Sequence, residues 1–253
     1  MNKISAYLIT KNEEARLPET LKAVSQVADE IIVVDSGSTD KTLEIAKKYN
    51  ARIFSHEWIS YANQKNFAQN QCKNKWLLSL DADEVLSPAL IDEISALKTK
   101  EPQYKAYNLQ IADIFPGMKY KRGTRTYKII RLYNRDYATM HPDLLTEDRI
   151  ALTQKVPVGT LRAPVYHHSF LSISRQVSKL NKYTDEVQQV ILKKKKRYSK
   201  IRLCFEFPRQ FFHYYIIKMY IIHGMWGFIS AMNLAYARFL KIAKYFEKEK
   251  LGE

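Results

Sequence analysis

Two carboxylates separated by one residue are the strongest chemical signal in this chain of 253 residues. Asp81 and Asp83 directly follow a short apolar run, residues 76–80, of the kind that buried central strands of α/β sheets show. Open α/β sheets bind their ligands at the carboxyl ends of their strands. Paired carboxylate oxygens suit Mg²⁺ or Mn²⁺, with substrate phosphates completing the shell. The pair predicts a metal-assisted phosphate site; for the motif taken alone, a solvated acidic turn is the alternative.

The residues before this pair predict β-α repeats that bring another carboxylate to the same sheet edge. We expect strands at residues 4–10, 30–35 and 51–54, with a helix after each. The second strand ends in Asp35, and the third helix, residues 60–73, is polar. This pattern is typical of a nucleotide-binding α/β domain. Since the chain has neither Gly-x-Gly-x-x-Gly nor a Gly-Lys-Ser/Thr loop, we expect a metal to hold the phosphates.

Three segments resemble the motifs of family 2 glycosyltransferases of the GT-A fold. They run from Leu8 to Glu14, from Val33 to Asp40 and from Leu80 to Glu84. Within this family the chain is similar to the lipopolysaccharide inner-core β-1,4-glucosyltransferase group. The likeness implies an α/β, GT-A catalytic domain at residues 1–170. It implies a basic, aromatic-rich helical extension at residues 171–253, where the likeness rests on composition alone.

The resemblance implies an inverting hexosyl transfer from a UDP-sugar, with UDP-glucose the nearest match. The donor-binding positions that carry over are Thr10, Asn12, Asp35, Lys65 and Asp81. Asp35 would accept the uracil N–H, a role that suits a strand-end carboxylate. Asp83 would bind Mn²⁺ or Mg²⁺, which assists the departure of UDP as a Lewis acid.

Two residues near these positions have competing interpretations. Lys65 is either a cation near the base and phosphates or a solvated lysine on a polar helix. Glu84 is either a partner of the metal site or an acid that leads into the next helix, and we expect the second. The helix itself begins at Ser87-Pro88, a clear start signal.

The catalytic base is expected on the segment from His141 to Asp148, because an inverting transfer needs a carboxylate to take the acceptor proton. The related glucosyltransferases carry Val-His-Glu there, which points to Glu147, whereas other family members read Thr-Glu-Asp, which points to Asp148. This chain has Thr146 in place of the histidine. Both acids stay candidates, and Asp143 is a poorer third.

His167 is the candidate histidine ligand of the metal, by its place in the family pattern His-x-Ser-aromatic. It is followed by His168, and adjacent residues of a strand point to opposite faces, so one of the two at most would serve. A histidine with a structural role is the alternative, which we favour on general grounds. Cys72 and Cys204 show no zinc or disulfide spacing and fit a reducing compartment.

Forty-one Lys and Arg against twenty-six Asp and Glu give a net charge of +15, which calls for an anionic partner or surface. Residues 193–202 form a basic run that leads into an aromatic stretch. Basic and aromatic residues interleaved on helices fit an interfacial attachment to an anionic membrane, and we expect no spanning helix. A packed helical subdomain with solvated lysines is the alternative. No signal peptide precedes the first strand, so we expect a cytoplasmic protein on the inner face of the membrane.

Other functions stay open at this point. The acceptor is expected to be the heptose of a lipopolysaccharide core, or else a polyprenyl-phosphate or another envelope glycan. A nucleic-acid-binding protein would explain the basic run but not the strand-end carboxylates, so no nucleic acid is expected. A catalytically inactive relative acting as a scaffold is opposed by the intact Asp35, Asp81 and Asp83.

Overall fold

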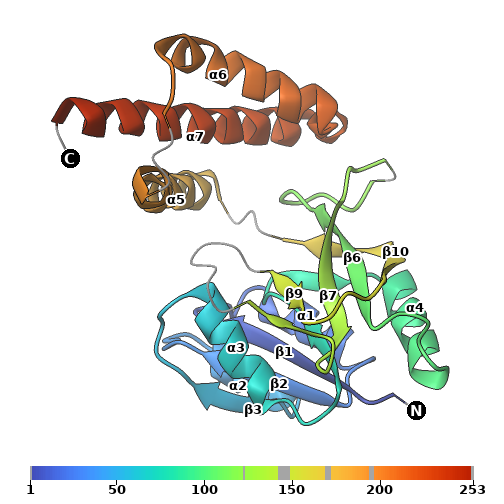
Figure 1. The fold of residues 1–253 in the computed structure, drawn as a ribbon. Helices are drawn as coiled ribbons and strands as arrows, with labels where there is room; N and C mark the ends of the chain where they lie inside the picture. Colours follow the sequence, from blue (N-terminus) through green and yellow to red (C-terminus); the bar gives the residue numbers. More distant parts are fainter. Residues whose placement is uncertain (1, 122, 142–148, 169–171, 194–196, 252–253) are drawn as a thin grey trace. The chain divides into compact units, whose positions relative to one another are not determined.

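The computed structural model describes residues 2–121, 123–141, 149–168, 172–193 and 197–251 (Figure 1). The chain forms two compact units. The first, the sheet unit, comprises residues 1–113 and 126–168. The second, the helical unit, comprises residues 114–125 and 169–253. The short segment 114–125 therefore belongs to the helical unit, although in sequence it connects two neighbouring strands of the sheet.

The sheet unit alternates strands and helices in its first half and consists mainly of strands in its second. Its strands are β1 (Ile4–Thr10), β2 (Glu30–Asp35), β3 (Arg52–Ser55), β4 (Trp76–Ser79), β5 (Glu84–Leu86), β6 (Ala106–Asp113), β7 (Tyr127–Asn134), β8 (Ala138–Met140), β9 (Ile150–Leu152) and β10 (Val158–His167). Its helices are α1 (Leu17–Val24), α2 (Thr42–Lys48), α3 (Tyr61–Gln71) and α4 (Pro88–Thr99). The predicted β-α repeats are confirmed, and Ser87 caps α4 by accepting the N–H of Leu90.

Eight strands form one sheet in the order β3-β2-β1-β4-β7-β6-β10-β5, and β8 pairs separately with β9. The first four strands are parallel. β7 runs antiparallel to β4 and β6, and β5 runs antiparallel to β10. The strand order reverses between β2 and β4, on either side of β1. Ligands of open α/β sheets bind at such a reversal, beyond the carboxyl ends of the strands.

The connection from β4 to β5 shows that the sheet curls. Four strand spacings separate β4 from β5 in the sheet order, which is about 19 Å if the sheet were flat. Residues 80–83 alone join them, and even a fully extended chain of that length spans only about 18 Å. The chain also turns there, because Glu84 N–H donates to the carbonyl of Asp81. The curl therefore returns the end of β10 to the neighbourhood of the β4–β5 turn.

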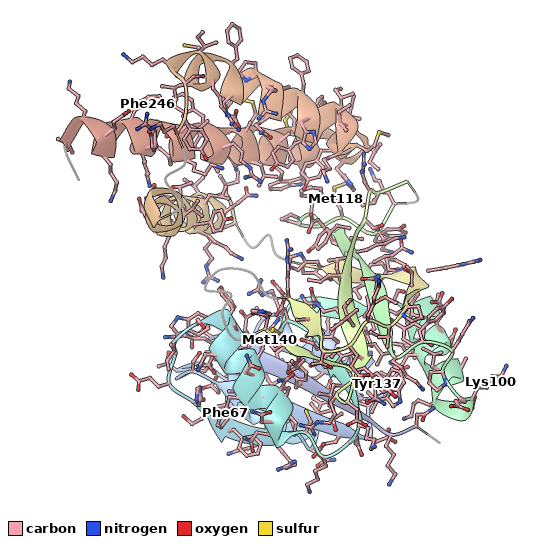
Figure 2. All side chains as sticks on the ribbon, viewed as in Figure 1. Phe67, Lys100, Met118, Tyr137, Met140 and Phe246 are labelled. Atoms are coloured by element: carbon pink, nitrogen blue, oxygen red, sulfur yellow. The ribbon has the colours of Figure 1, made fainter. Side chains whose placement is uncertain are left out.

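Apolar side chains fill both faces of the sheet. On one face the core includes Leu8, Leu78 and Leu90 and is closed by α1 and α4. On the other it includes Tyr7 and Met140, with Phe67 of α3 packed against it (Figure 2). α3 is unusual because it buries polar side chains, Gln64, Lys65 and Gln69, against the sheet.

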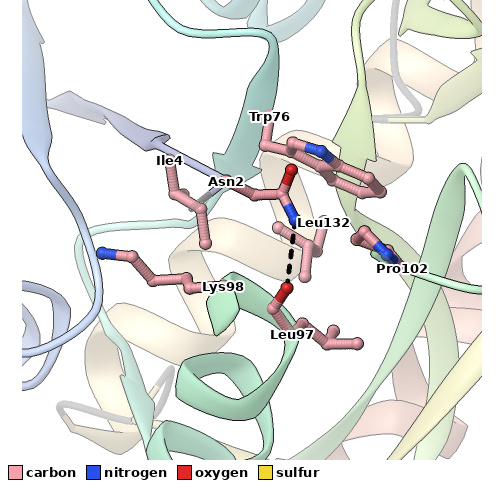
Figure 3. A pocket seen from close by; sticks show the side chains of 7 residues that line it. All are labelled: Asn2, Ile4, Trp76, Leu97, Lys98, Pro102 and Leu132. Carbon is pink, nitrogen blue, oxygen red and sulfur yellow. Dashed lines mark hydrogen bonds between the residues drawn. The ribbon is translucent and has the colours of Figure 1, made fainter. Parts of the chain in front are cut away.

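A small pocket lies at the amino ends of β1 and β4, the sheet edge opposite the predicted site (Figure 3). Ile4, Trp76, Leu97 and Leu132 supply its apolar lining. Asn2 crosses it and donates its side-chain amide to the carbonyl of Leu97. This contact ties the start of the chain to the end of α4, which is a structural task.

The helical unit contains three long helices, and its short helices lie where the chain reverses between the second and the third. They are α5 (Ile173–Lys193), α6 (Lys200–Phe212), the π-helix η1 (His213–Ile217), the 3₁₀ helix η2 (Tyr220–His223) and α7 (Gly224–Leu251). Tyr198, Ile242 and Tyr245 form its buried core, and α6 lies along α7 (Figure 1). The predicted helical extension is confirmed. No helix in the described ranges is long and apolar enough to cross a membrane.

Candidate active site

Two loops at the carboxyl ends of β1 and β2 are joined by hydrogen bonds into one rigid edge. Asn12 N–H donates to Ser38 Oγ at 2.8 Å, and Asn12 Oδ1 accepts the N–H of Thr39 at 2.8 Å. Asn12 has φ +56°, a left-handed conformation that asparagine tolerates better than most residues. Asn12, which was predicted to bind the UDP-sugar, thus links the two loops. Its backbone N–H and its side-chain Oδ1 both make hydrogen bonds within the chain.

Asp35 is buried at the end of β2, beside Thr10 of β1. Its Oδ2 accepts the N–H groups of Gly37 and Ser38 at 2.9 and 2.8 Å. Its Oδ1 accepts the hydroxyls of Thr10 and Ser38. Two carboxylate oxygens have about four acceptor positions, so the chain itself fills all of them. Binding of a uracil N–H to Asp35 would therefore require one hydroxyl to turn away; the uracil role stays a prediction.

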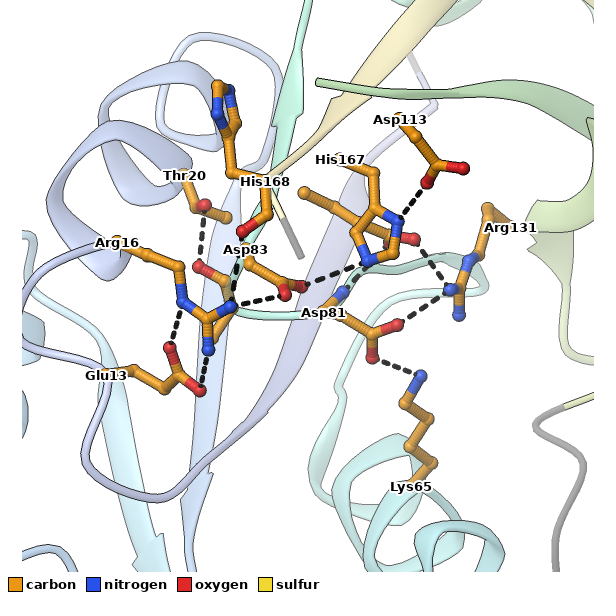
Figure 4. Close-up of polar contacts among 12 residues, drawn as sticks. Glu13, Arg16, Thr20, Lys65, Asp81, Asp83, Asp113, Arg131, His167 and His168 are labelled. Carbon is orange, nitrogen blue, oxygen red and sulfur yellow. Dashed lines mark hydrogen bonds and ion pairs between the residues drawn. The ribbon is translucent and has the colours of Figure 1, made fainter. Parts of the chain in front are cut away.

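Asp81 lies between two cations that come from different elements (Figure 4). Lys65 Nζ of α3 is 2.6 Å from Oδ1, and Arg131 Nη2 of β7 is 2.9 Å from Oδ2. Burial opposes ionisation of Asp81, but Lys65 and Arg131 outweigh it and hold the pKa well below its usual range. Asp81 is therefore an anion held in place by two cations. The alternative of a solvated acidic turn is wrong for this residue.

The structure contradicts one interpretation of Lys65 and one of Glu84, and the donor role of Lys65 stays a prediction. The Lys65 side chain is 0% exposed, so it is not a solvated lysine. Glu84 is buried on β5, where its Oε1 meets Arg131 Nη2 at 2.8 Å and its Oε2 accepts the N–H of Asp81 at 3.0 Å. The expectation that Glu84 only leads into a helix is wrong, because Glu84 belongs to strand β5 and its carboxylate pairs with Arg131. Burial raises the pKa of Glu84 despite this arginine.

Asp83 points the other way and meets a different set of partners. Arg16 Nη1 donates to its Oδ2 at 2.8 Å. The same guanidinium donates from Nε and Nη2 to both carboxylate oxygens of Glu13, at 2.7 and 2.6 Å. The loop before α1 thereby supplies the charge that balances Asp83. The turn is fixed as well, since Thr20 Oγ1 donates to the carbonyl of Ala82.

His167 ends β10 and faces Asp83 with one ring nitrogen and Asp113 with the other. Nδ1 lies 2.9 Å from Asp113 Oδ1, and Nε2 lies 3.7 Å from Asp83 Oδ1. Burial alone would lower the pKa of His167, but the hydrogen bond to Asp113 and the charges of Asp83 and Asp113 raise it to about 9. Its neighbour His168 contributes its backbone, donating N–H to the carbonyl of Asp83 at 2.9 Å.

The donors around Asp83 fit Mn²⁺ or Mg²⁺. Carboxylate oxygen and imidazole nitrogen are ligands that Mn²⁺ accepts, and the 3.7 Å separation of Asp83 and His167 is too long for a hydrogen bond. Asp113 orients the ring in the way that carboxylates commonly orient metal-binding histidines. Over the described ranges, no cluster of three or more His, Cys, Asp or Glu could hold a metal. The remaining ligands would have to come from a phosphate-bearing substrate.

The three acids proposed as catalytic base, Asp143, Glu147 and Asp148, lie outside the described residues. His141 and Arg149 flank them, and His141 N–H donates to the carbonyl of Arg149 at 3.2 Å. The assignment of the base stays a prediction.

Three site residues were missed by sequence reasoning: Arg16, Arg131 and Asp113. Arg131 carries a signal that can be recognised, because it interrupts the apolar run of β7, and a charged residue in a buried strand needs a partner. Arg16 follows Glu13 by three residues, a spacing that indicates only a local pair. Asp113 ends β6 and differs in no local way from an ordinary strand-end acid.

Comparison with known proteins identifies the class. The sequence profile of Glycosyl transferase family 2 matches residues 5–179, which is more than half of the chain. The chain therefore belongs to this family, and the predicted α/β fold of GT-A type agrees with the observed sheet.

Two relatives in sequence agree with this assignment. The chain is 39% identical over 254 residues to an uncharacterized glycosyltransferase of Rickettsia bellii (strain RML369-C), covering 97% of this chain and 86% of the relative. It is 31% identical over 262 residues to the lipopolysaccharide core biosynthesis glycosyltransferase LpsC of Rhizobium meliloti (strain 1021), covering 98% and 93%. Among solved structures, S. aureus TarS 1–349 is similar with a TM-score of 0.48 and 14% identity, covering 99% of this chain and 92% of that one.

Proposed function

We propose that this glycosyltransferase moves a hexose, glucose by the family resemblance, from a UDP-sugar to the heptose of a lipopolysaccharide core, with inversion and with Mn²⁺ or Mg²⁺. The observation that carries the proposal is the carboxylate pair on the β4–β5 turn, with Asp81 between two buried cations and Asp83 facing His167. The similarity to LpsC of Rhizobium meliloti, a lipopolysaccharide core biosynthesis glycosyltransferase, supports a lipopolysaccharide acceptor.

The site residues would have different roles, which follow from their surroundings. Asp83 and His167 would hold the metal, which stabilises the negative charge of the departing diphosphate. Asp113 keeps the His167 ring oriented. Lys65 and Arg131 keep Asp81 ionised and in place, so that it can accept hydroxyl hydrogen bonds from the ribose or the sugar.

The acceptor side depends on a carboxylate that removes a proton from the attacking hydroxyl. Glu147 and Asp148 are the proposed bases, with Asp143 as the third candidate. We also propose that the protein attaches peripherally to an anionic membrane through its helical unit, where its acceptor is anchored. The net charge of +15 supports an anionic surface as partner.

A panel of donors and acceptors tests the reaction. Purified protein is mixed with radiolabelled UDP-glucose, UDP-galactose or UDP-N-acetylglucosamine, with Mn²⁺, Mg²⁺ or EDTA, and with lipopolysaccharide cores that end in heptose. We expect label to enter the core from UDP-glucose with metal and not with EDTA, and Asp83→Asn to abolish it. Label that enters a polyprenyl-phosphate and no core would move the acceptor to the alternative class. Metal-independent transfer would remove the role of Asp83.

A further inference from the structure

The chain reversal between α6 and α7 presents apolar side chains to the outside. We call these residues the reversal tip, and their exposed fractions range from 42% to 72%: Phe212, Ile216, Ile217, Met219, Ile221 and Met225. They follow one another from the last residue of α6 through η1 and η2 to the first turn of α7. Exposed apolar residues gathered in one place mark a site that another surface covers.

The reversal tip is held in place by well-packed residues behind it. Phe115 meets Tyr220 edge-on at 5.5 Å and His223 at 4.8 Å. Gly227 lies so close to the carbonyl of Tyr220 that an added Cβ would stand 1.8 Å from its oxygen. This contact requires glycine. The exposed side chains are therefore carried by a fixed scaffold.

Two cations donate hydrogen bonds to the backbone of the chain reversal. Lys121 Nζ donates to the carbonyl of Ile222 at 3.0 Å, and Arg125 Nη1 donates to the carbonyl of Ile217 at 2.6 Å. Both cations come from the segment 114–125, which thereby brings its positive charge directly to the tip. Lys119 is exposed on the same segment, and Lys218 belongs to the tip's own sequence.

The sequence of the reversal tip and of the segment 114–125 carries no acidic residue. The sequence contains no Asp or Glu between Glu206 and Glu247, nor within the segment 114–125. A cationic rim around exposed apolar side chains is complementary to an anionic lipid surface, where the apolar groups reach the acyl boundary and the cations meet the headgroups. A surface that faces another protein would instead be expected to carry positive and negative side chains together.

From this arrangement we infer that the reversal tip is the part of the protein that inserts into the anionic membrane, with the segment 114–125 supplying the headgroup contacts. The inference rests on the membrane attachment in the proposed function and makes it specific. Sequence reasoning placed the attachment on the basic run of residues 193–202 and on the aromatic stretch that follows it, whereas the exposed tip is mainly aliphatic.

Vesicle binding by matched variants tests the inference. Partition of the full-length protein into phosphatidylglycerol–phosphatidylethanolamine vesicles is measured by flotation at 0.1 M salt. Ile217→Ser with Ile221→Ser should lower the partition coefficient at least tenfold. Ile201→Ser with Leu251→Ser changes two side chains that are more exposed, 74% and 66% against 54% and 45%, at the far ends of α6 and α7, and should stay within twofold of wild type. Circular dichroism verifies that both variants fold.

A fluorescent label gives an independent reading of insertion. An NBD dye is attached to Ile221→Cys in a Cys204→Ser background. Its fluorescence emission should shift to shorter wavelength and become at least twofold more intense on anionic vesicles. Leu251→Cys should show neither change.

The outcomes separate the tip from the wider proposal. If the tip variant binds like wild type while reversing the charges of residues 193–197 releases the protein, the tip assignment is overturned and the membrane attachment stands. If the wild type binds no vesicle, both fall, and the donor panel still judges the transferase on its own. A lipid-free dimer that the tip variant converts to monomer would assign the tip to a second copy of the chain and overturn the lipid.

Discussion

Asp81 and Asp83 stand one residue apart, yet their surroundings follow different rules. The cations that face Asp81 are Lys65 and Arg131, with side chains 0% and 5% exposed, anchored in a helix and a central strand. The groups that face Asp83 are Arg16 and His167, on a loop and at a strand end, and are 17% and 20% exposed. Fixed buried partners suit a residue that must not move. Accessible partners suit one that exchanges them for a metal and a substrate.

The sharpest test of this contrast is Arg131→Met, on the Asp81 side. It leaves Glu84 buried without its cation. The free energy of unfolding should fall by about 3–5 kcal/mol, because a buried charge without a partner is strongly destabilising. Urea unfolding followed by circular dichroism measures the change. Lys128→Met, an exposed position on the same strand, should stay within about 0.5 kcal/mol of wild type. A loss below about 1 kcal/mol for Arg131→Met would show that the Asp81 side is not fixed by this pair.

On the Asp83 side the larger effect should fall on activity. Asp83→Asn should reduce metal-dependent turnover at least about 100-fold, since one charged ligand is lost, while unfolding changes by no more than about 1 kcal/mol. Steady-state kinetics at saturating donor and urea unfolding give the two readings. Should the variant unfold as readily as Arg131→Met, the two sides would be equally structural and the contrast would fail.

Asp113→Asn removes the carboxylate that orients His167 without touching Asp83. Mn²⁺ affinity, measured by calorimetry with UDP present, should drop about 10–100-fold, the usual cost of losing such a partner. A matched change at Asp136→Asn, a surface acid paired with Lys75, should leave the affinity as it is. An unaltered affinity for Asp113→Asn would favour the structural role of His167.

Arg16→Gln should have a smaller effect in the opposite direction. Its guanidinium would compete with the proposed metal for Asp83, so its removal should tighten Mn²⁺ binding several-fold, about 1 kcal/mol for one charge a few ångströms away. Arg16→Lys keeps the charge and should bind as the wild type does. Weaker binding by Arg16→Gln would mean that the arginine positions Asp83 for the metal rather than competing with it.

Cysteine labelling gives the mildest test, because it reports on α3 without changing the site. Burial raises the pKa of Cys72, at the end of α3, to about 12, whereas Cys204 is exposed. Native protein should therefore take up one equivalent of iodoacetamide at pH 8, on Cys204, and two equivalents after unfolding. Mn²⁺ should not alter the protection of Cys72, and Arg131→Met should weaken it. Fast labelling of Cys72 in the native wild type contradicts a rigid Asp81 side.

Features encoded by neighbouring residues could be predicted from the sequence. The apolar runs of β1, β2 and β4 and the Ser87-Pro88 start of α4 are local signals, and each is confirmed. The carboxylates at the ends of β2 and β4 share one edge because parallel strands end together.

The partners of those carboxylates could not be predicted, because they are distant in sequence. Arg131 is 50 residues from Asp81, Arg16 is 67 from Asp83, and Asp113 is 54 from His167. Lys65 was ambiguous for another reason: a polar helix normally faces water, but α3 turns its polar residues toward the sheet. Its chemistry was visible in the sequence and its burial was not.

The pairing of β5 with β10 has a consequence for how the protein comes into being. Glu84 stands opposite His167 in that ladder, so the strand that follows Asp83 has its partner only after 83 further residues have been made. At a synthesis rate of about 5–20 residues per second, the β4–β5 turn waits about 4–17 s on the ribosome before β10 emerges. During that interval the nascent chain lacks His167, and β5 lacks the strand that it pairs with. The carboxylate pair is made early, and its surroundings are completed only when most of the sheet unit has been translated.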